Sequence, residues 1–228
     1  MISIVIPTYN EAENIGPLVT YLSKNCKGTC EVIISDGGSL DETMQVAEAA
    51  GARVFLSPAR GMASQMNYGA SIAKGDILYF IHADTFPPES FVGDIQKALH
   101  EGYDFGRYRT AFNSNKAVLK INAFFTRFDW FVCYGGDQTL FITKTLFNSI
   151  HGFNEHMRIM EDYDIVLRAK NFGWYKVLRK AAMVSARKYE TNSWLTVQMA
   201  NRKIIQMYKK GASQQDMVNK YKEMLVYR

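Results

Sequence analysis

The chain opens with a short apolar run that ends in a cluster of polar residues, and this junction constrains the fold most. Residues 2–6 read Ile-Ser-Ile-Val-Ile, which is typical of a strand buried on both faces of a parallel sheet. Pro7 has no backbone N–H for a sheet ladder, so we expect the strand to end there. Thr8, Asn10 and Glu11 then lie at its carboxyl end, where open α/β sheets bind ligands. The alternative is an ordinary loop that caps the next helix.

The same unit, an apolar strand followed by a helix, recurs through the first half of the chain. Further strands are predicted at 31–36, 53–56 and 76–81, and helices at 40–50, 62–73 and 89–100. In the less regular second half, strands are predicted at 105–112 and 138–142, a strand pair or a strand with a loop at 174–184, and helices at 116–130, 144–149 and 162–172. The repeated units predict an α/β fold whose mostly parallel central sheet has helices on both faces.

A basic, amphipathic tail over 194–227, interrupted by Gly211, ends the chain. We therefore expect an α/β domain over 1–190 and a C-terminal helical extension over 191–228, within one compact unit. The segment 194–210 interleaves apolar side chains with arginines and lysines, and it has two interpretations. It could make peripheral contact with an anionic membrane. It could instead pack on its own domain or on the partner of a homodimer, and we favour packing.

Composition narrows the class of partner. A net charge of +5 suggests an anionic partner such as nucleotide phosphates or an acidic membrane face, although a solvated basic surface fits equally well. The charge is too small to indicate nucleic acid. Three cysteines without a histidine cluster argue against zinc and fit a reduced setting. Without a charged leader or a long apolar span, we expect a cytoplasmic protein, with the inner face of the membrane as an alternative location.

A second polar cluster follows the strand predicted at 31–36. Asp36 ends that strand, and Gly37 and Gly38 permit a tight turn with close backbone approach to a ligand. The Asp36 carboxylate could accept hydrogen bonds from a ribose or a base edge. Ser39 or Asp41 would cap the next helix. The same residues are also typical of an ordinary turn.

A third cluster precedes the helix predicted at 62–73. Arg60 can pair with a phosphate there, and the helix N-terminus adds its own attraction for anions. Gln65 and Asn67 add amide groups to the same region. The alternative is an exposed loop arginine beside a polar helix face.

The residues His82, Ala83 and Asp84 follow the strand predicted at 76–81. Alternation along a strand would place His82 and Asp84 on one side, at the edge where a divalent ion bound to phosphates could sit. Oxygen ligands suit Mg²⁺ or Mn²⁺, and imidazole tolerates Mn²⁺ better. Alternatively, His82 is a structural polar residue and Asp84 caps the following helix.

Two further sites carry carboxylates. Glu161 and Asp162 open the helix predicted near 162–172, where acidic residues are ordinary capping chemistry. Asp162 could instead act as a base, since an ionised carboxylate can take a hydroxyl proton. Asp137 lies in the run Tyr-Gly-Gly-Asp-Gln over 134–138 and could orient an acceptor or simply make a turn.

Taken together, these residues resemble the family 2 glycosyltransferases, which have the GT-A fold. The resemblance covers roughly residues 2–188 and rests on the order and spacing of its motifs. These motifs are the opening Ile-Pro-Thr-Tyr-Asn-Glu over 6–11, Asp-Gly-Gly-Ser over 36–39 with Asp41, Arg60-Gly61, His82-Ala83-Asp84 and Glu161-Asp162. The segments 134–138, 160–164 and 185–188 resemble a small stand-alone bacterial branch of the family.

The resemblance implies a nucleotide-sugar donor, expected to be a UDP-sugar, and an unidentified hydroxyl acceptor. Asp84, with His82, would hold Mn²⁺ or Mg²⁺. Asp162 would be the base of an inverting transfer, with Glu161 and Asp137 beside it in the catalytic site. Arg187 and Lys188 would stabilise the leaving phosphates. The implied donor-binding residues are Pro7, Thr8, Asn10, Glu11, Asp36, Gly37, Gly38, Arg60, Gln65, Asn67, His82, Ala83 and Arg187.

One departure from the family pattern keeps other functions open. His82 stands where the family usually has the first carboxylate of an Asp-X-Asp motif, so we expect a weaker or Mn²⁺-biased metal site. A non-catalytic nucleotide-binding protein of the same fold is therefore one alternative. A nucleotidyltransferase is another, but it would need a basic glycine-rich loop after the first strand. Here that loop is acidic and polar, which counts against it.

Overall fold

The computed structural model describes residues 1–135 and 139–226. The strands are β1 (Ile2–Thr8), β2 (Cys30–Asp36), β3 (Arg53–Leu56), β4 (Ile77–Phe80), β5 (Thr85–Phe86), β6 (Phe105–Phe112), β7 (Leu140–Thr143) and β8 (Tyr175–Val184). The helices are α1 (Ala12–Cys26), α2 (Thr43–Ala49), α3 (Met62–Ser71), α4 (Phe91–His100), α5 (Ala117–Phe125), α6 (Lys144–Ser149), α7 (Glu161–Ala169), α8 (Lys188–Thr191), α9 (Trp194–Lys209) and α10 (Gln214–Met224), with the short 3₁₀ helix η1 (Phe131–Cys133).

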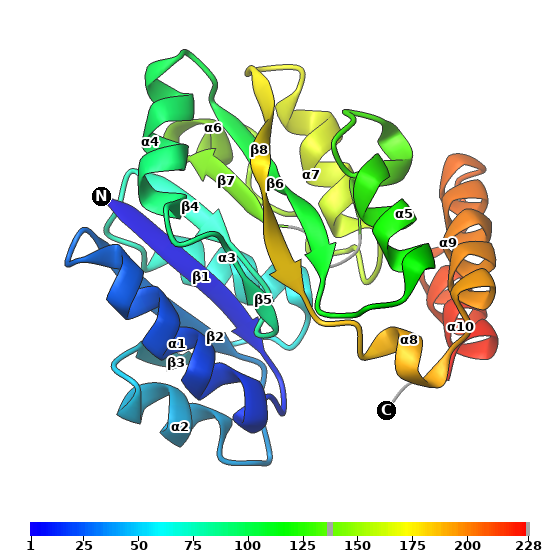
Figure 1. Ribbon diagram of the computed structural model, residues 1–228, viewed down its shortest axis with the longest axis horizontal. Coiled ribbons are helices and arrows are strands. Elements are labelled where there is room, and N and C mark those ends of the chain that lie inside the picture. Colours follow the sequence, from blue (N-terminus) through cyan, green and yellow to red (C-terminus); the bar gives the residue numbers. More distant parts are fainter. Residues whose placement is uncertain (136–138, 227–228) are drawn as a thin grey trace.

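Within these described ranges the strands form one eight-stranded sheet in the order β3-β2-β1-β4-β7-β6-β8-β5 (Figure 1). The neighbours β3, β2, β1 and β4 run parallel, and so do β6 and β8. Strand β7 is antiparallel to both β4 and β6, and β5 is antiparallel to β8. The parallel half carries the crossover helices that the repeated strand–helix units predicted.

Alternation along β1 divides the core into two layers. Ile4 and Ile6 face one side, where they join a cluster with residues of α1, α2 and α4. Val5 faces the other side, where it joins residues of α3, α6 and α7. Both faces of the sheet are therefore covered by helices, as predicted.

The expectation that Pro7 ends the first strand is wrong. Pro7 pairs with Ser35 of β2, and β1 continues to Thr8. The carbonyl of Val5 accepts from Ile81 on the β4 side, so Pro7, two residues later, also presents its backbone to that side. Pairing with β4 ends at Val5, so no ladder bond is required of Pro7.

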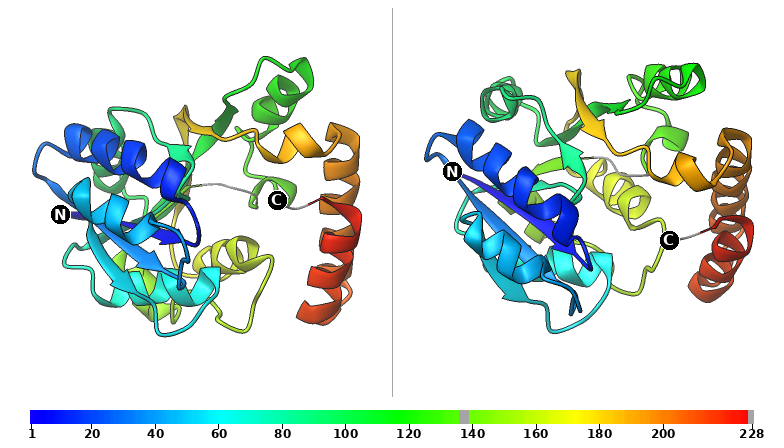
Figure 2. Two further views of the ribbon diagram at one scale, coloured as in Figure 1. Left: turned by 90° about the horizontal axis from the view of Figure 1, so that it is seen from below. Right: turned by 60° about the horizontal axis from the view of Figure 1, so that its bottom comes forward.

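The C-terminal helices pack on the rest of the chain. Ile204 of α9 and Met217 of α10 join the core cluster that includes α7, and Val197 and Ala200 pack with Leu119 of α5. Figure 2 shows α9 and α10 side by side, at the end of the molecule remote from α1 and α2. This is the packing arrangement that we favoured for the tail. Across residues 1–135 and 139–226, no helix combines the length and the apolar character needed to span a bilayer.

The cysteines differ from the expectation of reduced thiols, because Cys26 and Cys30 are joined by a disulfide. Lys27 and Gly28, with φ of 47° and 78°, turn the chain back after α1. This turn places the two Cα atoms 5.5 Å apart, which lies within the usual range for a disulfide. Cys133 is a buried free thiol.

Replacing Gly106 with alanine is expected to destabilise the fold. An added Cβ would lie 2.1 Å from the carbonyl oxygen of Lys176 and 2.8 Å from the ring of Phe141. Both neighbours belong to the sheet, so β6 and β8 would have to separate, at a cost of about 1–3 kcal/mol in urea unfolding. Gly93→Ala in α4 is the matched control, because its Cβ would meet nothing within 4 Å and alanine favours a helix. An equal loss in both variants would contradict this interpretation.

Candidate functional site

A buried carboxylate organises the edge of the sheet where β1 and β2 end. The Asp36 side chain is fully buried, and its Oδ2 accepts from Thr8 Oγ1 at 2.8 Å and from Ser39 Oγ at 2.6 Å. Its Oδ1 accepts from the backbone N–H groups of Gly38 at 2.9 Å and Ser39 at 2.7 Å. Four donors from the chain itself therefore satisfy this carboxylate, and Asp36 shapes the loop that follows β2.

Gln65 of α3 ties the ends of the same two strands together. Its amide Nε2 donates to the carbonyl oxygens of Thr8 at 2.7 Å and Ser35 at 2.8 Å, and its Oε1 accepts from Gly61 N–H at 3.3 Å. A Cβ at Gly37 would lie 2.8 Å from Gln65 Oε1, so this close approach requires glycine. Gln65 therefore positions the loops and is itself committed to backbone groups.

Asn67 lies outside this arrangement. The side chain of Asn67 donates to the Phe153 carbonyl at 2.9 Å and to Glu155 Oε1 at 2.8 Å, and it accepts from Phe153 N–H at 2.8 Å. It therefore holds the loop after α6. The prediction for Asp137 falls on a residue outside the described part of the chain.

The loops after β1 and β2 bind each other directly. Asn10 has a left-handed backbone with φ of 54°, and its N–H donates to Ser39 Oγ at 2.8 Å. Its side-chain Oδ1 accepts from Leu40 N–H at 2.8 Å. Beside these loops, the exposed Arg60 guanidinium stacks on the Tyr9 ring, 3.7 Å from its centroid. The loops thus form a preorganised polar edge with a cation at its rim.

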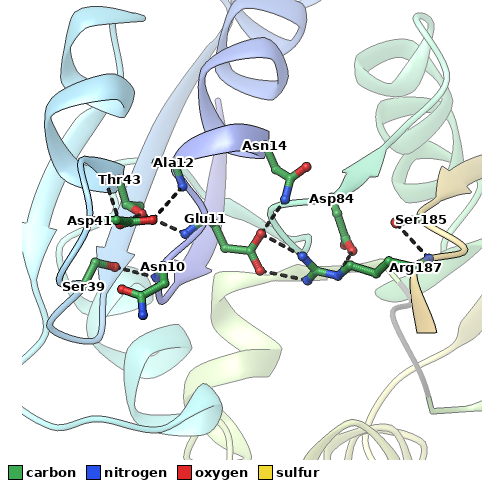
Figure 3. Close-up of polar contacts among 10 residues, drawn as sticks. All are labelled: Asn10, Glu11, Ala12, Asn14, Ser39, Asp41, Thr43, Asp84, Ser185 and Arg187. Carbon is green, nitrogen blue, oxygen red and sulfur yellow. Dashed lines mark hydrogen bonds and ion pairs between the residues drawn. The ribbon is translucent and has the colours of Figure 1, made fainter. Parts of the chain in front are cut away.

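Arg187 joins two of the predicted site residues across the carboxyl ends of the strands (Figure 3). Its Nη1 and Nη2 donate to the two Glu11 oxygens at 3.0 and 2.8 Å, a bidentate pair. Its Nε lies 3.1 Å from Asp84 Oδ2. Glu11 also accepts from Asn14 Nδ2 at 2.7 Å. Glu11 after β1 and Asp84 after β4 therefore both contact the guanidinium of Arg187, which follows β8.

His82 and Asp84 do not follow the alternation expected of a strand. Strand β4 ends at Phe80, and the chain turns so that Thr85 N–H donates to the His82 carbonyl at 3.1 Å. Asp84 pairs with Arg187, and His82 lies close to the Glu161 carboxyl and lines the same cavity. The alternation expected of a strand does not apply to residues 82–84, because β4 ends at Phe80 and is shorter than the apolar run.

Asp84 and His82 are the side chains that decide whether a divalent cation fits this site. Within residues 1–135 and 139–226, no three His, Cys, Asp or Glu side chains group closely enough to hold an ion by themselves. Asp84 and His82 offer at most two protein donors. Mg²⁺ commonly takes one or two carboxylates and completes its shell with substrate phosphates and water. The residues therefore fit a cation that is held jointly with a diphosphate.

The start of α7 presents Glu161 and Asp162 to a cavity of about 900 Å³ that His82 also lines. Met160 precedes them with a left-handed φ of 71°. The Glu161 Oε2 atom is buried and has no hydrogen-bond partner in the described part of the chain. Burial raises the pKa of Glu161, and the charge of His82 partly offsets this.

The C-terminal helices, which the sequence presented as a tail, form another wall of this cavity. Asn201, Ile205 and Lys209 of α9 line it, together with Tyr221 of α10. Sequence reasoning missed their place in the site. The signal was present in the mixed apolar and basic pattern of 194–210, but a pattern does not say which surface a helix meets.

Solved structures share the fold of this chain. S. aureus TarS matches with a TM-score of 0.68 over 87% of this chain and 64% of its own, at 18% identity. Glucosyl-3-phosphoglycerate synthase (GpgS) from Mycobacterium tuberculosis matches with a TM-score of 0.66 over 93% of this chain and 80% of its own, also at 18% identity. The protein has the GT-A fold with C-terminal helices, and the predicted fold class is confirmed.

Residues 3–162 match the model of glycosyl transferase family 2, and the protein belongs to that family, as predicted. A PGL/p-HBAD biosynthesis glycosyltransferase of M. tuberculosis is 28% identical over an alignment of 189 residues that covers 74% of this chain and 69% of the relative. An undecaprenyl-phosphate 4-deoxy-4-formamido-L-arabinose transferase of Serratia proteamaculans is 30% identical over an alignment of 113 residues that covers 45% of this chain and 35% of the relative. The chain thus spans less than two thirds of both the Serratia relative and TarS.

Replacing Glu161 with glutamine is expected to make stability less dependent on pH. Between the ordinary value of 4.5 and its raised pKa, the folded protein keeps a proton that the unfolded chain has lost. Wild-type stability therefore falls as pH rises through this window, and the stability of Glu161→Gln relative to wild type should grow. Urea unfolding at a series of pH values measures the difference. The exposed Glu48→Gln is the control, and a slope shared by both variants would contradict burial as the cause.

Proposed function

We propose that the protein is an inverting glycosyltransferase that transfers a sugar from a UDP-sugar to a hydroxyl acceptor. The observation that carries the proposal is that the polar loops and the carboxylate-lined cavity meet at one edge of the sheet. Preordered loops after β1 and β2 lie beside the Arg187–Asp84 pair, and His82 in the next turn opens on the cavity of Glu161 and Asp162. Structures of TarS with UDP-GlcNAc and of GpgS with Mn²⁺ and UDP-glucose support a donor of this class.

In this mechanism the first two loops receive the nucleoside. Asn10 and Gly38 set the backbone shape of the pocket, with Asp36 and Gln65 as positioning residues behind it. Arg60 and Arg187 supply positive charge toward the diphosphate. Asp84 and His82 would hold the divalent cation, which supplies charge stabilisation to the leaving diphosphate when bound.

Asp162 serves as the base in this proposal. Its carboxylate lies in the first turn of α7 and lines the cavity. It takes the proton from the acceptor hydroxyl while that oxygen bonds to the anomeric carbon. The bond from the anomeric carbon to the diphosphate oxygen breaks on the opposite face, so the configuration inverts. The cavity beside Asp162 provides the space for the acceptor.

Replacing Asp162 with asparagine is expected to lower the rate of sugar transfer by about 10²–10⁴-fold, since the amide cannot take the hydroxyl proton. UDP affinity should stay unchanged because the nucleoside loops are untouched. UDP release in the presence of donor and acceptor measures the rate, and calorimetry measures binding. Asp164→Asn is the matched control, because that carboxylate is held by Arg168 on the same helix. Wild-type activity in Asp162→Asn would rule out the assigned base.

Calorimetric titration with UDP is expected to show binding that Mn²⁺ strengthens. Asp84→Ala should reduce the Mn²⁺-dependent gain by about tenfold or more, because it removes the one carboxylate assigned to the cation. The exposed Asp76→Ala is the control and should retain the gain. Absence of binding to UDP, and to GDP in the same assay, would overturn the donor site.

Non-catalytic nucleotide binding is the second candidate function, and the two ion pairs of Arg187 favour it. Arg187 already neutralises Asp84 and Glu11, so the site can hold its charge without a cation. This function predicts UDP binding without Mn²⁺ dependence, sugar transfer or donor hydrolysis. The two assays above therefore distinguish it from the transferase.

A further inference from the structure

The segment 116–132, which contains α5 and most of η1, carries a concentrated apolar surface. Among the described residues, 17 large apolar side chains are exposed, and six of them lie between positions 118 and 132. Their exposed fractions are 37–59%. Clustering of this kind marks an interaction surface, whereas scattered exposed residues need no explanation. The six residues, here called the α5 surface, are Val118, Ile121, Phe124, Phe125, Trp130 and Val132.

The aromatic members of the α5 surface, with Phe128 between them, form one continuous patch. Phe128 stacks on Trp130 with ring centroids 4.4 Å apart, and Phe125 lies 6.2 Å from Trp130 and 5.6 Å from Phe124. Leu119, by contrast, is 1% exposed and anchors α5 to the core. The helix therefore has its buried contact on one face, while Phe124 and Phe125 are exposed. The ribbon of α5 lies at the periphery of the molecule (Figure 2).

Apart from Asp129, the charged residues of the segment 116–132 are cations. Lys116, Lys120 and Arg127 are exposed within the segment, and the Arg127 guanidinium lies 3.8 Å from the centroid of the Phe124 ring. Asp129 is the one acidic residue between 113 and 132, and Lys170 neutralises it at 2.5 Å. Exposed aromatic and branched side chains beside cations that form no ion pair within residues 1–135 and 139–226 match the interface of an anionic bilayer.

We propose that the α5 surface docks the protein on an anionic lipid bilayer. A second copy of the chain fits less well, because a two-fold contact would bring the same cations face to face. Phe125 and Val132 also line the cavity that contains Glu161 and Asp162. A docked protein would therefore hold that cavity close to the bilayer. The docking itself does not depend on sugar transfer, so it can be tested apart from the proposed function.

Co-sedimentation with vesicles tests the proposal. The wild-type chain should bind phosphatidylglycerol–phosphatidylcholine vesicles and not pure phosphatidylcholine vesicles, and added salt should weaken binding. The double variant Phe124→Ser/Trp130→Ser should bind about tenfold more weakly or worse, since two aromatic side chains no longer enter the interface. Phe172→Ser/Trp174→Ser is the matched control, because these residues are 70% and 75% exposed and do not belong to the segment 116–132. Lys120→Glu/Arg127→Glu should also reduce binding.

Several outcomes would overturn the proposal. These are failure of the wild-type chain to bind anionic vesicles, equal binding by both aromatic double variants, or loss of binding only in Leu195→Gln/Met199→Gln on α9. Light scattering adds a further outcome, since a dimer that dissociates in Phe124→Ser/Trp130→Ser, without vesicle binding, would assign the surface to a second copy. Circular dichroism confirms that each variant is folded, which is expected because all substituted side chains are exposed or partly exposed.

Discussion

The buried carboxylate of Asp36 is the interaction on which the ligand edge of the sheet depends. Burying a charge without partners is costly, and four donors offset that cost here. One donor comes from Thr8 at the end of β1 and the others from the loop after β2. The charge can therefore be satisfied only when both segments adopt this arrangement. Gln65 then fixes the two strand ends from α3, so the polar edge is ordered by the chain itself.

Arg187 extends this order to the second half of the chain. Its bidentate contact with Glu11 and its contact with Asp84 join segments that follow β1, β4 and β8. The charges at the edge are thus balanced within the protein. A diphosphate entering this region would meet the Arg187 guanidinium, which Glu11 and Asp84 already hold in place. The same two carboxylates reduce the net positive charge around Arg187. This arrangement couples the loops after β1 and β4 to the segment that leads into the C-terminal helices.

Much of the fold could be read from local pattern. The strands at 53–56 and 105–112 and the helix at 144–149 have the predicted bounds, because apolar periodicity and flanking turn residues agree there. The predicted bounds of strands and helices were wrong where contacts with another segment set where the strand or helix begins or ends. Pro7 stays within β1 because β4 has already ended beside it, and the helix expected at 40–50 begins at Thr43 because residues 39–41 bind the loop after β1.

The sequence by itself determined the type of fold, the family and the chemistry of the site residues, because these follow from periodicity and from motif residues in a set order. Only the tertiary structure decided what each polar group faces. Asp36 and Gln65 are committed to the chain itself, Asp84 meets Arg187, and the tail forms a wall of the cavity. Hydrogen bonds, ion pairs and burial join residues that are distant in sequence, and their partners are set by how the strands and helices pack.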